Sequence, residues 1–416
     1  MIKTTLVINI KNPSRKSHFE KLFNMSRHFT LVMKEPTWEK RYFDNIIDVD
    51  TENLVDLISC LEKNTARFVY EGIFTLVEHA VPLTAILANY FDLKYISIET
   101  ALKSRVKNMM RESFISFGIQ CPKYGLAENI QQAKILGERL GYPLVLKPLI
   151  GGGSLSVMRM DNEKELAVFF DQLKVQAAKE FEYDILTPFI TQKYNQAMIL
   201  EQYIEGSEIS VESIVAQHQT NIICIHDKRL PMEGPYFEEK LFSTPSELDG
   251  TIVEKVKSIT KLANKSLGIN MGATHTEFRI DAKGIPYIIE VGARIGGGPV
   301  YVSTLNSTGI DMVEKIVELA TEGACTFPEK RLKNPVGFQH FFSQEKGILK
   351  KYVIPESIFE NPNVIEFLPY IETGSSVLLP PNSVAHGHII VKGKDILEIE
   401  STINEVEQGI KIILEE

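Results

Sequence analysis

The first part of the chain alternates short apolar runs with helical patterns. Apolar runs TTLVINI, FTLVMK and RFVYEG predict strands at 4–10, 29–34 and 67–72, and amphipathic stretches predict the intervening helices 14–25, 52–64 and 76–91. This alternation predicts a parallel sheet of the open α/β kind, which binds ligands at the carboxyl ends of its strands. The region contains no GxGxxG, so a dinucleotide site is not expected.

The rest of the chain changes pattern. A basic helix is predicted at 101–118 and a further helix at 133–142, followed by a strand, a glycine loop and a second strand within 143–160. Alternation over 198–224 indicates a central antiparallel sheet. The predicted elements that follow are a long loop at 226–248, a helix at 249–268, a hairpin at 273–294, and then short strands before an amphipathic helix at 401–416.

Composition limits the functional class. With 416 residues the chain is long enough for two or three domains, and 44% hydrophobic and 24% charged residues are average for a globular protein. A net charge of −9 argues against a general nucleic-acid binder. No apolar run is long enough for a membrane span or a signal peptide, so we expect a cytoplasmic protein. The four cysteines are widely spaced and are expected to be reduced thiols: Cys60, Cys121, Cys224 and Cys325.

The predicted hairpin carries two acids on one face. If Asp281–Gly284 forms the turn, Glu277 lies opposite Ile288 and diagonal to Glu290, and His275 lies opposite Glu290. The two acids would then be about 7–8 Å apart. The other face is expected to hold the apolar residues Phe278, Ile280, Tyr287, Ile289 and Val291.

Two neighbouring carboxylates repel unless a cation lies between them. Oxygen ligands suit Mg²⁺ or Mn²⁺, and Mg²⁺ commonly takes one or two carboxylates together with substrate phosphates. Arg294 follows four residues after Glu290 and offers a planar fork for carboxylate or phosphate oxygens, beside the glycines 296–298. The alternative is a solvated face of an exposed hairpin.

A second glycine loop, Gly151–Ser156, lies between two predicted strands. It is not a Walker A loop, because GxxxxGK[ST] does not occur in the chain. Backbone amides and serine hydroxyls in such a turn can still bind phosphate. Lys147 ends the otherwise apolar strand PLVLKP, where a buried cation would need an anionic ligand. A turn without function is the alternative.

The order of these features resembles the ATP-grasp superfamily. The stretch 104–124 resembles its entry helix, LEQYIEGSEISVE its adenine and ribose segment, and THTEFRI with IPYIIEVGAR its metal hairpin, over about Lys103 to Leu319. THTEFR, GPYFEE followed by PSEL, and GHIIVKGKD look most like bacterial L-amino-acid ligases. The resemblance implies an α/β fold, α+β in its centre. The implied division is an N-terminal parallel-sheet domain at 1–100, a small lobe with a glycine-rich flap at 101–185, a central sheet with the metal hairpin at 186–325, and a β-rich lobe at 326–416.

The resemblance also implies roles for single residues. ATP phosphates would be bound by Lys107 and Lys147 and covered by Gly153, Ser154 and Ser156. Adenine would be held by Glu201, Gln202, Tyr203 and Ile204, and ribose by Glu208. Glu277 and Glu290 would carry Mg²⁺, and Arg294 would hold the substrate carboxylate and then stabilise the acyl phosphate. Many relatives have Asn where this chain has Gly292, which leaves the number of metal ions open.

The expected activity is an ATP-dependent carboxylate–amine ligase that joins two L-amino acids through an acyl phosphate and releases ADP and phosphate. An acid for the first substrate's ammonium group is expected at Glu239, with Glu238 and Glu233 as alternatives, and His275 is a candidate substrate contact. Gly298 would leave room for a bulky second substrate. The expected partners are small-molecule amino-acid substrates. A homodimer is one of the oligomeric states that the sequence leaves open. Another ATP-grasp ligase, of the carboxylase or nucleotide-precursor type, and a non-catalytic ATP-binding module are the alternatives.

Overall fold

The N-terminal part is a parallel sheet, as expected. The structure is a computed structural model that describes residues 1–229, 235–237, 239–379 and 385–415. The sheet has the order β3-β2-β1-β4, with parallel pairing throughout. Its elements are β1 (Ile2–Ile8), α1 (Lys16–Phe23), β2 (Phe29–Met33), β3 (Asn45–Asp48), α2 (Leu54–Asn64), β4 (Phe68–Thr75) and α3 (Val81–Tyr90). The sequence pattern did not predict β3, which is only four residues long.

The expected basic helix at 101–118 is two helices. α4 (Ile98–Arg105) and α5 (Lys107–Ser116) are separated at Val106, whose backbone is extended (φ −98°, ψ 107°). Without a proline or glycine at this point, the sequence gives no signal for the break. The break lets the Lys107 amide donate to the Leu149 carbonyl at 2.9 Å, which fixes the start of α5 against the small lobe.

The small lobe is a four-stranded sheet covered by helices. Its order is β5-β8-β6-β7. Its elements are β5 (Tyr124–Ala127), α6 (Ile130–Leu140), β6 (Leu144–Pro148), β7 (Met158–Met160), α7 (Glu163–Glu180), α8 (Thr187–Tyr194) and β8 (Met198–Gln202). The expectation that 198–224 forms one sheet is wrong, because β8 belongs to this lobe and β9 (Ser207–Ala216) to the next sheet. The chain turns between them at Gly206 (φ 145°).

An eight-stranded sheet forms the centre of the molecule. Its order is β13-β12-β9-β10-β11-β14-β18-β16. Its central elements are β10 (Gln219–Lys228), β11 (Leu241–Thr244), α9 (Gly250–Leu267), β12 (Gly272–Ile280), β13 (Pro286–Gly292), α10 (Val300–Thr308) and α11 (Met312–Glu322). The expected loop at 226–248 is therefore shorter, since β10 reaches Lys228 and β11 begins at Leu241.

The C-terminal part continues this sheet. β14 (Val336–Phe341), β18 (Gly387–Lys392) and β16 (Val364–Pro369) extend it, and β17 (Ser376–Val377), β15 (Gly347–Val353) and β19 (Lys411–Leu414) form a small sheet. The two helices are α12 (Glu356–Glu360) and α13 (Ile396–Gly409). The helix expected at 401–416 thus begins earlier and gives way to β19. Strands on both sides of residue 325 share one sheet, and the four domain boundaries stay predictions.

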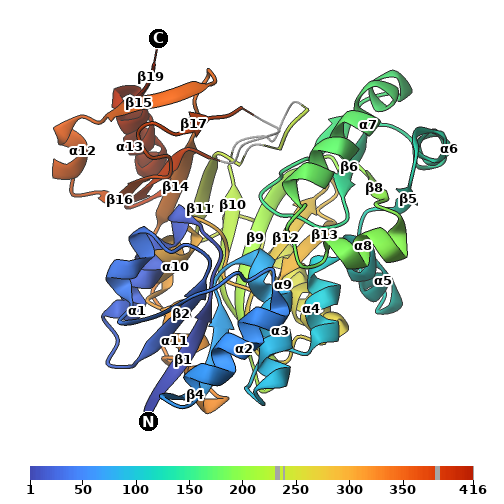
Figure 1. The fold of residues 1–416 in the computed structure, drawn as a ribbon. Helices are drawn as coiled ribbons and strands as arrows, with labels where there is room; N and C mark the ends of the chain where they lie inside the picture. The colour runs from blue at the N-terminus through green and yellow to red at the C-terminus, as the bar shows by residue number, and fades with distance from the viewer. Residues whose placement is uncertain (230–234, 238, 380–384, 416) are drawn as a thin grey trace.

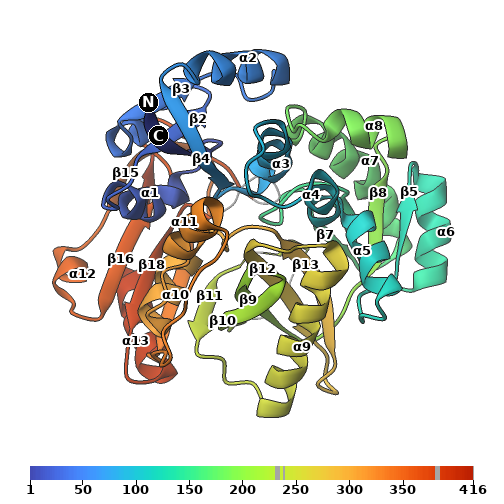
Figure 2. The same cartoon turned by 90° about the horizontal axis from the view of Figure 1, so that it is seen from below.

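Packing fixes the parts against one another. α11 lies between the N-terminal sheet and the large sheet, where Phe74, Val317 and Ile214 belong to one buried cluster. In Figures 1 and 2 the small lobe and the C-terminal part lie on opposite sides of the large sheet. Among the described residues, no helix combines the length and the apolar composition needed to cross a membrane.

Candidate active site

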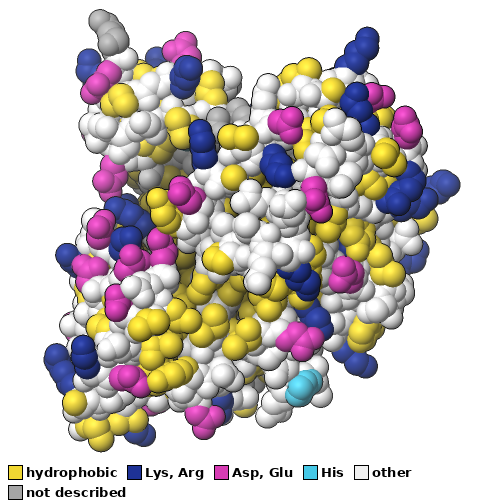
Figure 3. Space-filling model, turned by 45° about the vertical axis from the view of Figure 1, so that its right-hand side comes forward, with side chains coloured by type: hydrophobic (Ala, Val, Ile, Leu, Met, Phe, Trp, Pro, Cys, Tyr) yellow, Lys and Arg dark blue, Asp and Glu magenta, His cyan; other side chains and the backbone are white. Residues whose placement is uncertain are grey.

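A large cavity lies where these parts meet. Its volume is about 830 Å³, and its wall includes Ile10–Arg15 and Val77–His79, which follow β1 and β4. This is the carboxyl edge of the parallel sheet, as expected. Apart from Ser156, every site residue proposed from the sequence lines this cavity. Figure 3 shows the surface hollowed between two projecting parts, with basic and acidic side chains interspersed on that face.

The hairpin places its two acids directly opposite each other. Glu277 pairs with Glu290 and Phe278 with Ile288, so Ile289 is an extra residue in a β-bulge. The expected pairings, Glu277 with Ile288 and His275 with Glu290, are therefore wrong by two residues. The bulge accounts for one residue of this shift. The turn, which is one residue longer than expected and places Ile280 opposite Pro286, accounts for the other. The bulge also reverses two apolar residues, since Ile288 is buried in the core and Ile289 lines the cavity. Glu277 and Glu290 nevertheless share the cavity face.

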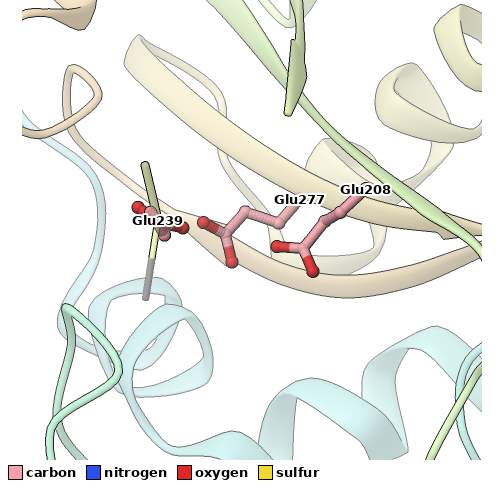
Figure 4. A group of neighbouring side chains, drawn as sticks. All are labelled: Glu208, Glu239 and Glu277. Atoms are coloured by element: carbon pink, nitrogen blue, oxygen red, sulfur yellow. The ribbon is translucent and has the colours of Figure 1, made fainter. Parts of the chain in front are cut away.

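Three carboxylates surround a lysine that the sequence pattern did not single out. Oxygens of Glu208, Glu239 and Glu277 lie within 4.8 Å of one another (Figure 4). The buried Lys228 Nζ lies 2.5 Å from Glu208 Oε1 and 3.3 Å from Glu277 Oε1, and it also pairs with Glu239. Burial alone would lower the pKa of Lys228, but the three carboxylates raise it well above its ordinary value. The alternatives to Glu239, Glu238 and Glu233, lie outside the described residues.

Two other lysines lie at the small-lobe end of the cavity. Lys147 Nζ is 2.6 Å from Glu201 Oε2, and Arg111 pairs with the same carboxylate at 2.8 Å. Burial would raise the pKa of Glu201, but Arg111 and Lys147 lower it to about 2. A protein acid therefore already balances Lys147, which the sequence alone did not predict. Lys107 Nζ lies 3.6 Å from Glu290 Oε1 and donates to the Gly151 carbonyl at 3.3 Å.

The glycine loop has residues that line the cavity and one serine that is buried away from it. Gly151, Gly153 and Ser154 have positive φ angles of 129°, 64° and 58° and line the cavity. A side chain at Gly151 would meet the Phe181 ring at 2.6 Å. Ser156 is fully buried and donates to Glu180 Oε2 at 2.8 Å, so its hydroxyl does not face the cavity in this structure.

The segment expected to hold adenine is fixed by backbone hydrogen bonds to neighbouring segments. The Gln202 amide donates to the Lys123 carbonyl at 2.8 Å, and the Tyr203 amide donates to the Pro143 carbonyl at 3.2 Å. The Tyr203 ring packs against the Arg279 guanidinium, 4.8 Å from the ring centroid. These two amides are therefore not available to a base, and Ile204 lies in the cavity wall next to them.

His275 lies between two acids. Its Nδ1 contacts the buried Glu212, and its Nε2 lies 3.3 Å from Glu277 Oε1. Burial would lower the pKa of His275, but Glu212 raises it to about 9. The protonated ring therefore orients Glu277 and is unsuited to serve as a base at neutral pH.

Arg294 has a partner in the N-terminal domain. Its Nε lies 2.7 Å from Glu78 Oε2. A side chain at Gly292 would meet that same oxygen at 2.7 Å, so the glycine makes room for Glu78. Burial would raise the pKa of Glu78, but Arg294 and Arg105 hold it below its ordinary value. Glu78 was missed because its one carboxylate precedes a helix far from the other motifs in sequence.

Comparison with known proteins agrees with this site. A family model described as the ATP-grasp domain matches residues 140–301. Residues 140–301 are therefore similar to an ATP-grasp domain. The chain is 26% identical to the alanine–anticapsin ligase of Bacillus subtilis (strain 168), over 90% of this chain and 86% of that protein.

Solved structures confirm the fold expected for this chain. An L-amino acid ligase from Bacillus licheniformis superposes with a TM-score of 0.88 at 24% identity, covering 100% of this chain and 99% of the other. A biotin carboxylase from Campylobacter jejuni gives a TM-score of 0.74 at 18% identity, with 99% and 92% covered. The expected α/β fold is confirmed, and the relatives that carry an enzyme name in this comparison include ligases, the class expected for this chain.

Proposed function

We propose that this protein joins two L-amino acids into a dipeptide at the expense of ATP. One observation carries the proposal: Glu277 and Glu290 lie side by side in the wall of one cavity, and Lys107, Lys147 and Arg294 line the same cavity. This arrangement supplies metal ligands, phosphate cations and a guanidinium for a carboxylate in one place. Similarity to an alanine–anticapsin ligase over 90% of the chain supports the amino-acid substrates.

The donor set fits Mg²⁺ or Mn²⁺. Glu277 and Glu290 offer hard oxygen ligands, and their cross-strand pairing brings both side chains to the same face. Glu208 and Glu239 add further oxygens near Glu277. When bound there with ATP, the metal would neutralise the charge of the triphosphate. Lys228 and His275 both contact Oε1 of Glu277 at 3.3 Å and hold this carboxylate in place.

The chain's own residues then align the reacting groups. Lys107, Lys147 and the glycine loop would position the γ-phosphoryl group, since phosphoryl transfer depends mainly on positioning and electrostatics. A carboxylate oxygen of the first amino acid attacks γ-phosphorus, and the bond to ADP breaks. The amine of the second amino acid then attacks the acyl carbon and loses a proton, and phosphate leaves. Arg294 would hold the first carboxylate and stabilise the negative charge that forms on it.

The ammonium group of the first substrate needs an acid. Glu239 remains our proposal, and its contact with Lys228 ties it to the cavity wall. Glu78 is a second candidate, because it lies beside Arg294 and an amino acid carries both an ammonium and a carboxylate group. Replacing Glu239 and Glu78 separately by Gln distinguishes them, since only the true partner raises the KM of the first amino acid and leaves that of the second unchanged.

A phosphate-release screen tests the function. ATP, Mg²⁺ and all pairs of L-amino acids are incubated with the protein, and active mixtures are examined by mass spectrometry. We expect phosphate release that needs two amino acids, with a dipeptide as product. Release driven by bicarbonate or by a purine precursor would instead indicate one of the other ATP-grasp ligases, and ATP binding without release would indicate a non-catalytic module.

A further inference from the structure

A buried arginine from the N-terminal domain faces the same cavity. Arg15 ends a short 3₁₀ helix (Pro13–Arg15) directly after β1, and Asn12 caps that helix by accepting from the Ser14 amide at 3.1 Å. Arg15 is 3% exposed and lines the cavity. One of its nitrogens, Nη1, lies 3.0 Å from the Gly296 carbonyl and 3.2 Å from His18 Nε2. The guanidinium is therefore held rigidly against the glycines that follow Arg294.

Neither contact of Arg15 carries a negative charge. Burial and then Arg15 itself lower the pKa of His18 well below its ordinary value, so the ring is neutral and accepts a hydrogen bond. Arg15 Nε has no hydrogen-bond partner in the described part of the chain, and no carboxylate there pairs with its guanidinium. Burial and then Arg294 lower the pKa of Arg15 to about 9, which leaves it charged at neutral pH.

The nearest acids are engaged by other cations. Glu78 pairs with Arg294, and Glu212 pairs with His275 and accepts from the Gly296 amide at 3.1 Å. A buried charge without a partner is costly, and a guanidinium is suited to bind a carboxylate in bidentate fashion. Arg15 therefore lacks the anion that its site is built to hold.

The space beside Arg15 fits the second amino acid. Gly298, two residues beyond the carbonyl that Arg15 contacts, has no side chain, and Tyr370 and His340 line the cavity next to it. A dipeptide ligase must hold two carboxylates: one is activated and loses its charge, and the other survives in the product. Arg294 lies near the metal acids and suits the first. Arg15 contacts the Gly296 carbonyl, two residues before Gly298, and suits the second.

We propose that Arg15 binds the α-carboxylate of the second, amine-donating amino acid. The proposal rests on the dipeptide-forming function and makes it more specific: the acceptor must be an α-amino acid rather than a simple amine. Arg15 is a binding residue in this assignment and takes no part in phosphoryl transfer.

Amino-acid amides provide the test. An α-amide keeps the amine but has no carboxylate to be phosphorylated, so it can serve only as the second substrate. The panel of twenty L-amino acids and their α-amides is offered to the wild-type protein and to Arg15→Gln, with a first amino acid active in the wild type. We expect the wild type to prefer acid over amide by at least about 30-fold in kcat/KM, the loss typical of a truncated buried charge pair. In Arg15→Gln the preference should fall to within about threefold, because only the acid loses affinity.

Controls separate this role from a structural one. KM values for ATP and for the first amino acid should be unchanged in Arg15→Gln. Arg27→Gln, which removes an exposed arginine of the same domain that pairs with Glu322, should retain the full preference. Arg15→Lys keeps the charge but not the planar fork of the guanidinium. We therefore expect the preference for acid over amide to fall by at least about fivefold. If Arg15→Gln does not fold, the lysine variant still tests the assignment.

Three results would contradict the inference. If folded Arg15→Gln retained the acid preference, Arg15 would not bind this carboxylate, and the dipeptide-forming function would be unaffected. If the variant raised the KM of the first amino acid, Arg15 would hold the carboxylate that is activated. If the wild type formed no dipeptide with any pair, both the proposed function and this assignment would fail.

Discussion

At the small-lobe end of the cavity, two buried cations lie against a protein carboxylate: Lys147 and Arg111 both pair with Glu201. At the opposite end, Arg15 contacts a carbonyl oxygen and a neutral histidine. Both ends exclude water from charged groups. They differ in where the balancing negative charge comes from, which is the protein at one end and, on our proposal, a substrate at the other.

This difference has a physical reason. Groups that align a triphosphate must be in position before it binds, and preorganised charges avoid reorganisation during the reaction. Carboxylates beside the lysines keep them fixed in the absence of ligand. A site for a single small carboxylate binds its ligand more tightly when the guanidinium has no other partner. The ligand then neutralises a buried charge that is unfavourable in the empty site.

The largest expected effect comes from the end of the cavity at which the protein itself supplies the balancing charges. Glu290→Gln keeps the shape of the side chain but removes the negative charge that faces Glu277 and Lys107. We expect kcat for amino-acid-dependent phosphate release to fall by about 10²–10³-fold, the size of a lost transition-state contact. The measurement is steady-state phosphate release at saturating ATP and Mg²⁺.

Glu205→Gln is the matched control for this variant, since Glu205 is exposed and does not line the cavity. Its turnover should equal that of the wild type. Full turnover in Glu290→Gln would remove Glu290 from the metal site.

The next effect is on stability. In Lys147→Met, Glu201 loses one of its two cations while it remains buried, at 2% exposure. We expect the free energy of unfolding to fall by about 3 kcal/mol, the low end for a broken buried pair, because Arg111 still contacts Glu201. The test is chemical denaturation at pH 7.

An exposed pair on the same lobe provides the comparison. Lys134 pairs with Glu163 at 2.8 Å, with side-chain exposures of 42% and 50%. Lys134→Met should cost less than about 1 kcal/mol. Equal losses for the two variants would show that the charges at the small-lobe end of the cavity are no more important to folding than surface charges.

The sequence predicted much of the fold because periodicity is local. The parallel strands β1, β2 and β4 and the hairpin carry alternating or continuous apolar runs, and these were recognised. The hairpin register was not, because the turn is one residue longer than expected and Ile289 bulges out of the pairing, and no side chain signals either change. The break at Val106 escaped for a similar reason, since it depends on the Lys107 amide reaching the Leu149 carbonyl.

The candidate site shows the same limit. Residues within motifs, such as Glu277 and Arg294, were found from spacing. Lys228, Arg111 and Glu78 were missed, because each is a single charged residue whose partner lies on another element. Buried charge pairs depend on tertiary contacts, which a one-dimensional pattern does not contain.

The smallest expected effect concerns the second-substrate end. A side chain at Gly298 would approach Tyr370 Oη at 3.0 Å and His340 Nε2 at 3.1 Å. Gly298→Leu should therefore narrow the space beside Arg15, and the ratio of kcat/KM for large over small second substrates should fall about tenfold, as expected for a few methylene groups in a pocket. Because Gly298 has φ +51°, leucine also strains the backbone. Gly374→Leu controls for that strain, since Gly374 has φ +84° and open space around it. An unchanged ratio in Gly298→Leu would place the second substrate elsewhere in the cavity, and the contrast between the two ends would then rest on Arg15 alone.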